Sequence, residues 1–161
     1  MVSKKIKVIT GKIGLDDHYR GIIAVTEALR DAGMEVVYLG TGQRIDGVIN
    51  TAIQEDADVI GLSFLCGGQV AIMKRFMQTL GERGLNHIMV IVGGIIPDDD
   101  IPKLKEMGVV EVFLPGTSLK QVVESVKREL ERYQANSQAQ GMSYVFWDAP
   151  KLTHRRSQSP G

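Results

Sequence analysis

The sequence contains very little cysteine and no long hydrophobic run. Cys66 is the only cysteine among 161 residues, so the chain cannot form an internal disulfide. The N-terminus, MVSKKIKVIT, becomes polar too quickly for a signal peptide, and both features favour a reducing, cytoplasmic setting. No apolar run approaches the roughly 18 residues that a membrane helix needs, so we expect no membrane span.

The chain also lacks an excess of charge of either sign. Lys and Arg together number 19, as do Asp and Glu, which gives a formal net charge of zero. This balance argues against a general nucleic-acid or membrane-surface binder, although a local basic patch stays possible. The length favours one domain with a substantial core, and it is too short for a (β/α)₈ barrel, which needs about 250 residues.

Five short apolar runs alternate with five amphipathic segments. The runs, rich in Val and Ile, cover residues 6–10, 35–39, 59–63, 88–92 and 111–114. Continuous runs of this kind are typical of strands buried on both faces. The segments with helical spacing cover residues 22–33, 45–57, 70–84, 101–108 and 118–133. Strict alternation predicts an α/β fold with a five-stranded parallel sheet and helices on both faces, in the flavodoxin-like order 2-1-3-4-5.

The chain changes character after residue 133. Residues 134–141, QANSQAQG, are polar, and the segment that follows holds Tyr144, Phe146 and the only tryptophan, Trp147. We therefore divide the chain into a domain at 1–133 and a C-terminal tail at 134–161. The tail is either a disordered end or an arm whose aromatic side chains dock residues 142–152 on a partner or a neighbouring copy.

The loops that follow the strands are the expected place for a ligand. In an open α/β sheet, ligands bind at the carboxyl ends of the strands where the strand order reverses, here between the first and third strands. The loop after the first strand, GKIGLDDHYRG, is unusually charged, and the later loops contain two glycine pairs and a Pro-Gly turn. No G-x-G-x-x-G follows the first strand, and no G-x-x-x-x-G-K-[ST] occurs. The acidic pair and lysine of a receiver domain are also absent, because the third strand ends in Ser63 and the fifth in Pro115.

His18, in that first loop, has three interpretations. It is a surface histidine, a zinc ligand, or the single protein ligand of a metal held by its own cofactor. A zinc site needs further ligands, and Cys66, His87 and His154 are scattered along the sequence. A single-histidine ligand needs only a carboxylate to hold the proton of its other ring nitrogen, and Asp16 lies two residues away.

Three motifs resemble those of cobalamin-binding domains in carbon-skeleton mutases. They are D-x-H-x-x-G at residues 16–21, S-x-L at 63–65 and a glycine pair at 93–94, in order and in the corresponding loops. The resemblance covers about residues 3–133. Within the family, KIGLDDHYRG is similar to the K-x-G-L-D-G-H-D-R-G stretch of acyl-CoA mutases of the methylmalonyl-CoA and 2-hydroxyisobutyryl-CoA type. Asp17 replaces the usual glycine and Tyr19 an acidic residue, which leaves the substrate open.

The resemblance implies that the chain binds adenosylcobalamin with the dimethylbenzimidazole tail displaced from cobalt. His18 would be the axial ligand of cobalt, Asp16 would hold the proton of its other nitrogen, and Lys12 would balance the charge of Asp16. Ser63 would hydrogen-bond the benzimidazole. The other implied cofactor contacts are Gly21, Leu65, Gly93, Gly94, Gly116 and Thr117.

The resemblance also implies a partner. Mutases of this type bind acyl-CoA in a (β/α)₈ barrel, so the chain would be the small subunit of a hetero-oligomer, inactive without a large barrel subunit. Three alternatives stay open. They are the small subunit of an amino-acid mutase of the glutamate mutase type, a corrinoid methyl-carrier, and a cobalamin-dependent sensor. A methyl-carrier usually has a helical domain before the sheet, and a sensor would need an output domain. We expect no nucleic-acid partner.

Overall fold

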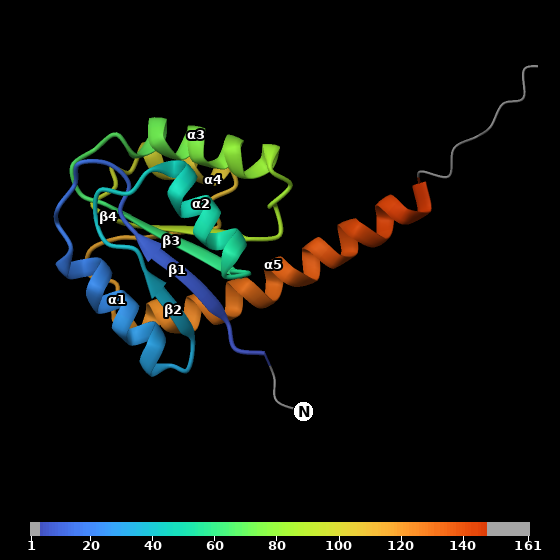
Figure 1. Cartoon of the computed structure of the whole chain (residues 1–161), viewed down its shortest axis with the longest axis horizontal. Coiled ribbons are helices and arrows are strands. Elements are labelled where there is room, and N and C mark those ends of the chain that lie inside the picture. Colours follow the sequence, from blue (N-terminus) through green and yellow to red (C-terminus); the bar gives the residue numbers. More distant parts are fainter. Residues whose placement is uncertain (1–3, 148–161) are drawn as a thin grey trace, which may run out of the picture.

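The backbone of residues 4–147, described by a computed structural model, forms one five-stranded sheet between two layers of helices (Figure 1). All pairings are parallel, and the order is β2-β1-β3-β4-β5. The strands are β1 (Lys7–Gly11), β2 (Glu35–Tyr38), β3 (Val59–Phe64), β4 (Met89–Gly94) and β5 (Glu111–Phe113). The predicted fold class and strand order are confirmed, and each predicted strand boundary lies within two residues of the observed one.

Helices cover both faces of this sheet because its strands are apolar on both sides. Ile9 and Ile60 face one hydrophobic cluster, whereas their neighbours Val8 and Val59 face the other. The first cluster is covered by α2 (Ile45–Gln54), α3 (Gln69–Glu82) and α4 (Asp100–Glu106). The second is covered by α1 (Arg20–Asp31) and α5 (Leu119–Trp147). The three central strands, β1, β3 and β4, are thus buried on both sides, as their continuous apolar sequences predict, whereas the edge strands β2 and β5 are only partly buried.

The ends of α1 and α5 have the expected local chemistry. Gly33 follows α1 with a φ of 93°, a left-handed conformation that glycine adopts without strain. Ser118 precedes α5, where its Oγ accepts a hydrogen bond from the Gln121 amide at 3.1 Å. The Gln121 side chain accepts one from the Ser118 amide at 2.9 Å in return. This reciprocal pair fixes the start of α5 and therefore the direction of the whole helix.

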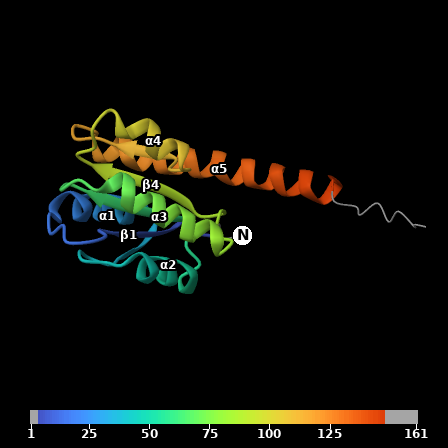
Figure 2. The ribbon, with the colours of Figure 1, turned by 90° about the horizontal axis from the view of Figure 1, so that it is seen from above.

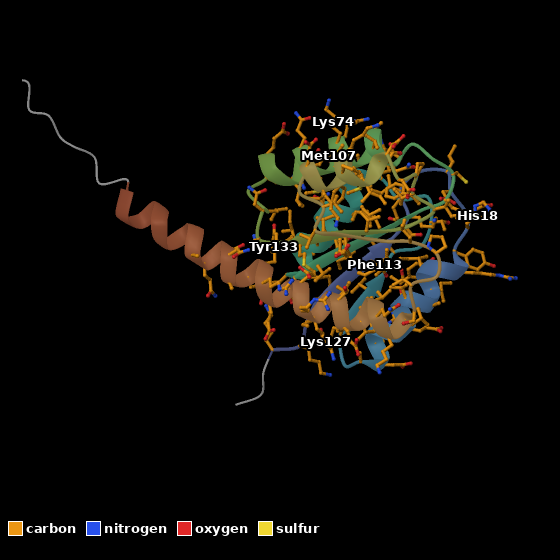
Figure 3. The ribbon with its side chains drawn as sticks, turned by 180° about the vertical axis from the view of Figure 1, so that it is seen from behind. His18, Lys74, Met107, Phe113, Lys127 and Tyr133 are labelled. Carbon is orange, nitrogen blue, oxygen red and sulfur yellow. The ribbon has the colours of Figure 1, made fainter. Side chains whose placement is uncertain are left out.

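Helix α5 is longer than the sequence pattern indicates. It continues from residue 133, the expected end, to Trp147, and its second half projects away from the sheet as an arm (Figures 1 and 2). The arm leaves the body at the end opposite His18 (Figure 3). The expected docking segment at 142–152 lies partly outside the described residues, so docking stays a prediction. No helix among residues 4–147 has the length and apolar character needed to cross a membrane.

Candidate functional site

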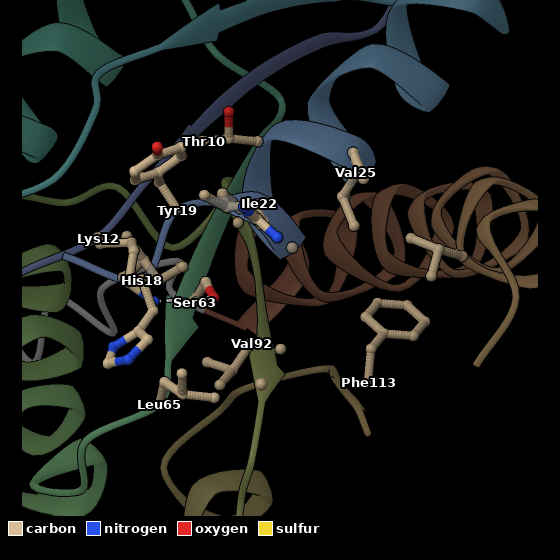
Figure 4. A pocket seen from close by; sticks show the side chains of 18 of the residues that line it. Thr10, Lys12, His18, Tyr19, Ile22, Val25, Ser63, Leu65, Val92 and Phe113 are labelled. Carbon is tan, nitrogen blue, oxygen red and sulfur yellow. Dashed lines mark hydrogen bonds between the residues drawn. The ribbon is translucent and has the colours of Figure 1, made fainter. Parts of the chain in front are cut away.

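A mostly apolar cleft of about 670 Å³ opens at the carboxyl end of the sheet, in the layer formed by α1 and α5. The ends of β1, β3 and β4 form its floor, and residues of α1 and α5 line its walls. Figure 4 shows the imidazole of His18 at one end of the cleft beside Leu65, with Val25 and Phe113 at the other end. The cleft lies between the first and third strands, where the order of the sheet reverses and where a ligand is expected.

His18 lies at the mouth of this cleft with one ring nitrogen bound and the other free. Its Nδ1 lies 3.0 Å from Oδ1 of Asp16, and its backbone amide donates to the same oxygen at 3.1 Å. The side chain is 57% exposed, and no described residue forms a hydrogen bond with Nε2. Because an ionised carboxylate accepts hydrogen bonds, Asp16 selects the tautomer with a proton on Nδ1. The lone pair of Nε2 is thereby left free to bind a metal.

Asp16 is itself held by a buried network. Its Oδ2 accepts a hydrogen bond from the Leu65 amide at 2.8 Å and pairs with Nζ of Lys12 at 3.1 Å. The Lys12 side chain is only 1% exposed, and its Nζ also donates to Oγ of Ser63 at 3.2 Å. A buried ammonium group needs such partners, because an unpaired charge in this environment is costly. The network therefore links the loop after β1 to the end of β3.

The pKa of the Asp16 carboxyl is well below its ordinary range. Burial, the largest single influence, would raise this pKa, but the hydrogen bonds from the His18 and Leu65 amides act against it. The Lys12 ammonium and the His18 ring also lower the pKa, and the four interactions together outweigh burial. All these donors favour the charged form, so Asp16 is an ionised, fully engaged acceptor at neutral pH.

Two glycines at the end of β4 allow the backbone to pass close to its neighbours. Gly94 has a φ of 124°, and a Cβ there would overlap the carbonyl oxygen of Phe64, its partner in the sheet. At Gly93 a Cβ would lie 3.6 Å from the carbonyl oxygen of Phe113. Only glycine fits position 94, and the absence of side chains at both positions keeps this wall of the cleft open.

Most of the predicted site residues line the cleft. They are Lys12, His18, Gly21, Ser63, Leu65, Gly93, Gly94 and Thr117. Asp16 lies behind His18 and reaches the site through the hydrogen bonds described above. Gly116 does not line the cleft, although its φ of 93° shapes the turn that brings Thr117 to the rim.

The inner end of the cleft was not predicted from the motifs. It is lined by apolar or small residues from the middle of strands and helices, including Val25, Gly61, Ile91, Phe113 and Val122. The one available signal was Gly61, a residue without a side chain in an otherwise bulky buried strand. A Cβ at Gly61 would lie 3.5 Å from Ile91, so its absence contributes to the space at the floor.

The structure brings Cys66 to His18, although the two are far apart in sequence. Cys66 is exposed, and its Sγ lies 3.6 Å from Nδ1 of His18. Partial loss of hydration beside neighbouring groups, together with the negative charges of Asp16 and Asp17, raises the pKa of the Cys66 thiol. The thiol is therefore protonated at neutral pH, and its contact with Nδ1 adds it to the groups around the imidazole.

Replacing Asp16 with asparagine should destabilise the chain by about 3 kcal/mol, because the buried Lys12 loses its charged partner. Urea denaturation of the cofactor-free protein measures this loss. Asp17→Asn is the matched control, since Asp17 is exposed one residue away and its change should cost less than about 0.5 kcal/mol.

The same pair of variants has a second, pH-dependent readout. The folded pKa of Asp16 is lowered, so its stabilisation is present above the ordinary pKa of about 3.9 and is lost as pH falls below it. The stability of Asp16→Asn should therefore fall less steeply on acidification than that of wild type or Asp17→Asn. Equal pH profiles for all three proteins would contradict the charge-based account of Asp16.

Comparison with known proteins identifies relatives over most of the chain. Residues 6–124 match the family model described as the B12 binding domain. The chain is 43% identical over 122 residues to the 2-hydroxyisobutanoyl-CoA mutase small subunit of Aquincola tertiaricarbonis, covering 76% of this chain and 90% of that relative. It is 44% identical over 124 residues to the pivalyl-CoA mutase small subunit of Xanthobacter autotrophicus, covering 77% of this chain and 83% of that relative.

The backbone also resembles solved structures of low sequence identity. A cobalamin-binding protein from Desulfitobacterium hafniense superposes with a TM-score of 0.68 at 20% identity. The match covers 78% of this chain and 60% of that one. Response-regulator receiver domains share the fold as well, for example that of NarL from Mycobacterium tuberculosis, with a TM-score of 0.62 at 17% identity. At these identities the likeness concerns the fold alone.

Proposed function

This chain belongs to the B12-binding domain family, and we propose that it is the cobalamin-binding small subunit of an acyl-CoA mutase. The mutase would catalyse a radical 1,2-rearrangement of the carbon skeleton of an acyl-CoA, with adenosylcobalamin as cofactor. We base this on one structural observation above all. A histidine with a free Nε2, oriented through Nδ1 by an ionised carboxylate, lies at the mouth of a deep apolar cleft.

The cleft and the histidine fit the two halves of cobalamin. A base-off cofactor has a flat aromatic base on a flexible tail. The cleft is apolar, has a volume of about 670 Å³ and is bounded by the glycines of β3 and β4, so it suits this base. Cobalt needs one further nitrogen ligand, and Nε2 of His18 is free at the rim. Cobalamin supplies the cobalt-based radical chemistry, for which protein side chains alone have no equivalent.

Within this proposal, the chain's own residues bind the cofactor and orient the histidine that would hold cobalt. Asp16 keeps the His18 proton on Nδ1 and fixes the ring, and the amide of Leu65 and the ammonium of Lys12 fix Asp16 in turn. Ser63 accepts a hydrogen bond from Lys12, so the proton of its own hydroxyl is free to point into the cleft. That proton is the donor we assign to the benzimidazole nitrogen.

A small subunit implies a larger partner, and we propose that this partner is a cytoplasmic (β/α)₈-barrel subunit that binds the acyl-CoA. Exposed apolar side chains around the mouth of the cleft support a covering partner. Tyr19, Ile95 and Leu119 line its rim and are 53%, 57% and 44% exposed. Leu15, three residues before His18, is fully exposed. A cofactor and a protein surface placed over His18 would together remove this apolar area from water.

Coexpression with the large subunit tests the proposed function. The purified pair should bind adenosylcobalamin and isomerise at least one member of a panel of branched acyl-CoA substrates, whereas either subunit alone should be inactive. Glutamate belongs in the panel because the glutamate mutase type is the alternative with the same motifs. Turnover of glutamate and of no acyl-CoA would replace our proposal with that alternative. Methyl transfer without isomerisation would replace it with a corrinoid methyl-carrier.

Replacing Ser63 with alanine should weaken binding of complete cobalamin by about 5- to 10-fold, the effect of one lost hydrogen bond of roughly 1–1.4 kcal/mol. Binding of cobinamide, which lacks the benzimidazole tail, should be unchanged. Absorbance titrations of both cofactors into wild type and Ser63→Ala measure the two affinities. An equal loss for both cofactors would remove Ser63 from the tail site and leave it a role in holding Lys12 only.

A further inference from the structure

We propose that Asp16, His18 and Cys66 form a binding site for a thiophilic divalent cation, most simply Zn²⁺, in the cobalamin-free chain. The three side chains offer a carboxylate oxygen, an imidazole nitrogen and a sulfur, and these atoms all lie within 4.8 Å of one another. This is a ligand set that zinc takes in open sites, with water in the fourth position. The sequence did not indicate this site, because Cys66 is distant from the other two residues along the chain.

The separations between the ligand atoms suit a tetrahedral ion. With bonds of about 2.3 Å to sulfur and about 2.0 Å to nitrogen and oxygen, a tetrahedral zinc ion places sulfur ~3.5 Å from nitrogen and nitrogen ~3.3 Å from oxygen. Cys66 Sγ lies 3.6 Å from His18 Nδ1, and His18 Nδ1 lies 3.0 Å from Asp16 Oδ1. The sulfur and the carboxylate oxygen lie within 4.8 Å of each other, and a bound ion would draw this third pair together.

The backbone holds the two contributing loops together. The Leu65 amide donates to Oδ2 of Asp16 at 2.8 Å, and Leu65 is the residue directly before Cys66. This bond joins the loop after β1 to the loop after β3 beside the proposed ligands. The exposed carboxylate of Asp17 adds negative charge near the thiol and favours a cation there. Cys66 is exposed, so an ion can reach the site from solvent.

Zinc at this site would exclude the coordination of cobalt by His18. Zinc would use the lone pair of Nδ1, so the ring proton must move from Nδ1 to Nε2, while the thiol of Cys66 releases its proton to solvent. Nε2 then has no lone pair for cobalt. The carboxylate of Asp16 would exchange the Nδ1 proton for the zinc ion and keep its bond to the Leu65 amide. The cofactor-free chain would therefore have a zinc-bound state that cannot take up cobalamin in the His-on form.

Zinc binding is tested first in the absence of cobalamin, which makes this test independent of the proposed function. Zinc chloride titrated into the untagged chain in a calorimeter should bind at one ion per chain. Cys66→Ala should weaken this binding at least about 10-fold, as expected for loss of a metal-site group, and His87→Ala should not. Aqueous cobalt(II) should give a thiolate charge-transfer band with wild type and none with Cys66→Ala. Absence of zinc binding, or equal binding by Cys66→Ala, would overturn the proposed site.

The exclusion of cobalamin is tested next, and it rests on the proposed function. Excess zinc should suppress the His-on spectrum of hydroxocobalamin with wild type, and a chelator should restore it. Cys66→Ala should bind cobalamin normally with or without zinc, since Cys66 is not among the proposed cofactor contacts. Zinc binding through Cys66 without any effect on cobalamin would overturn the exclusion. Failure of both proteins to bind cobalamin without zinc would instead count against the proposed function.

Discussion

Replacing His18 with alanine should abolish coordination of cobalt by a protein nitrogen and lower turnover of the reconstituted enzyme at least about 100-fold. Changes to groups that only orient a metal ligand often cost about 10- to 100-fold, so loss of the ligand itself should reach or exceed that range. The fold should survive, because the side chain is 57% exposed and contacts little of the core. Urea denaturation should therefore show almost unchanged stability.

Paramagnetic resonance of the cob(II)alamin form, with nitrogen-15-labelled histidine in the protein, measures the coordination directly. Wild type should show hyperfine coupling from a labelled protein nitrogen, and His18→Ala should show none. His87→Ala is the matched control, because His87 is an exposed histidine in the connection before β4, away from the cleft. Added imidazole should partly restore the nitrogen coupling of His18→Ala. Hyperfine coupling from a labelled protein nitrogen that persists in His18→Ala would assign the cobalt ligand to another histidine.

The fold was predictable from the sequence because its signals are local. Buried parallel strands are continuous apolar runs, and each run is separated from the next by a segment with helical spacing. The length of α5 was not predictable from polarity alone. Residues 134–141 look like a tail because they are polar, yet they contain no proline, and Gln and Ala are good helix formers. A helix that already begins at a well-capped end continues through them.

The site was predictable where its residues are close together in a sequence motif. It was not predictable where the tertiary structure brings distant residues together. Asp16 and His18 are two residues apart, so the sequence indicated their pairing. The near-complete burial of Lys12 was not indicated, because a lysine is normally exposed and is buried here only through Asp16 and Ser63. The proximity of Cys66 to His18 depends on how two loops meet, which no spacing along the chain specifies.

Replacing Gly94 with alanine should lower the free energy of unfolding by at least about 3 kcal/mol. Its φ of 124° alone strains any residue with a Cβ, at a cost of roughly 1–3 kcal/mol. The added carbon would also overlap the carbonyl oxygen of Phe64 and lie 2.8 Å from its carbonyl carbon. A backbone carbonyl within a sheet cannot rotate away as a side chain can. The end of β3 must therefore separate from β4 to make room.

Gly116→Ala separates these two costs, because Gly116 shares the left-handed conformation, with a φ of 93°, but has nothing within 4 Å of its added Cβ. It should lose only about 1–2 kcal/mol. Urea denaturation of both cofactor-free variants measures the difference, and equal losses would show that strain alone, without the collision, accounts for Gly94.

The collision also displaces the end of β3, which holds Ser63 and precedes Leu65. Gly94→Ala should therefore weaken cobalamin binding even under conditions in which the chain stays folded.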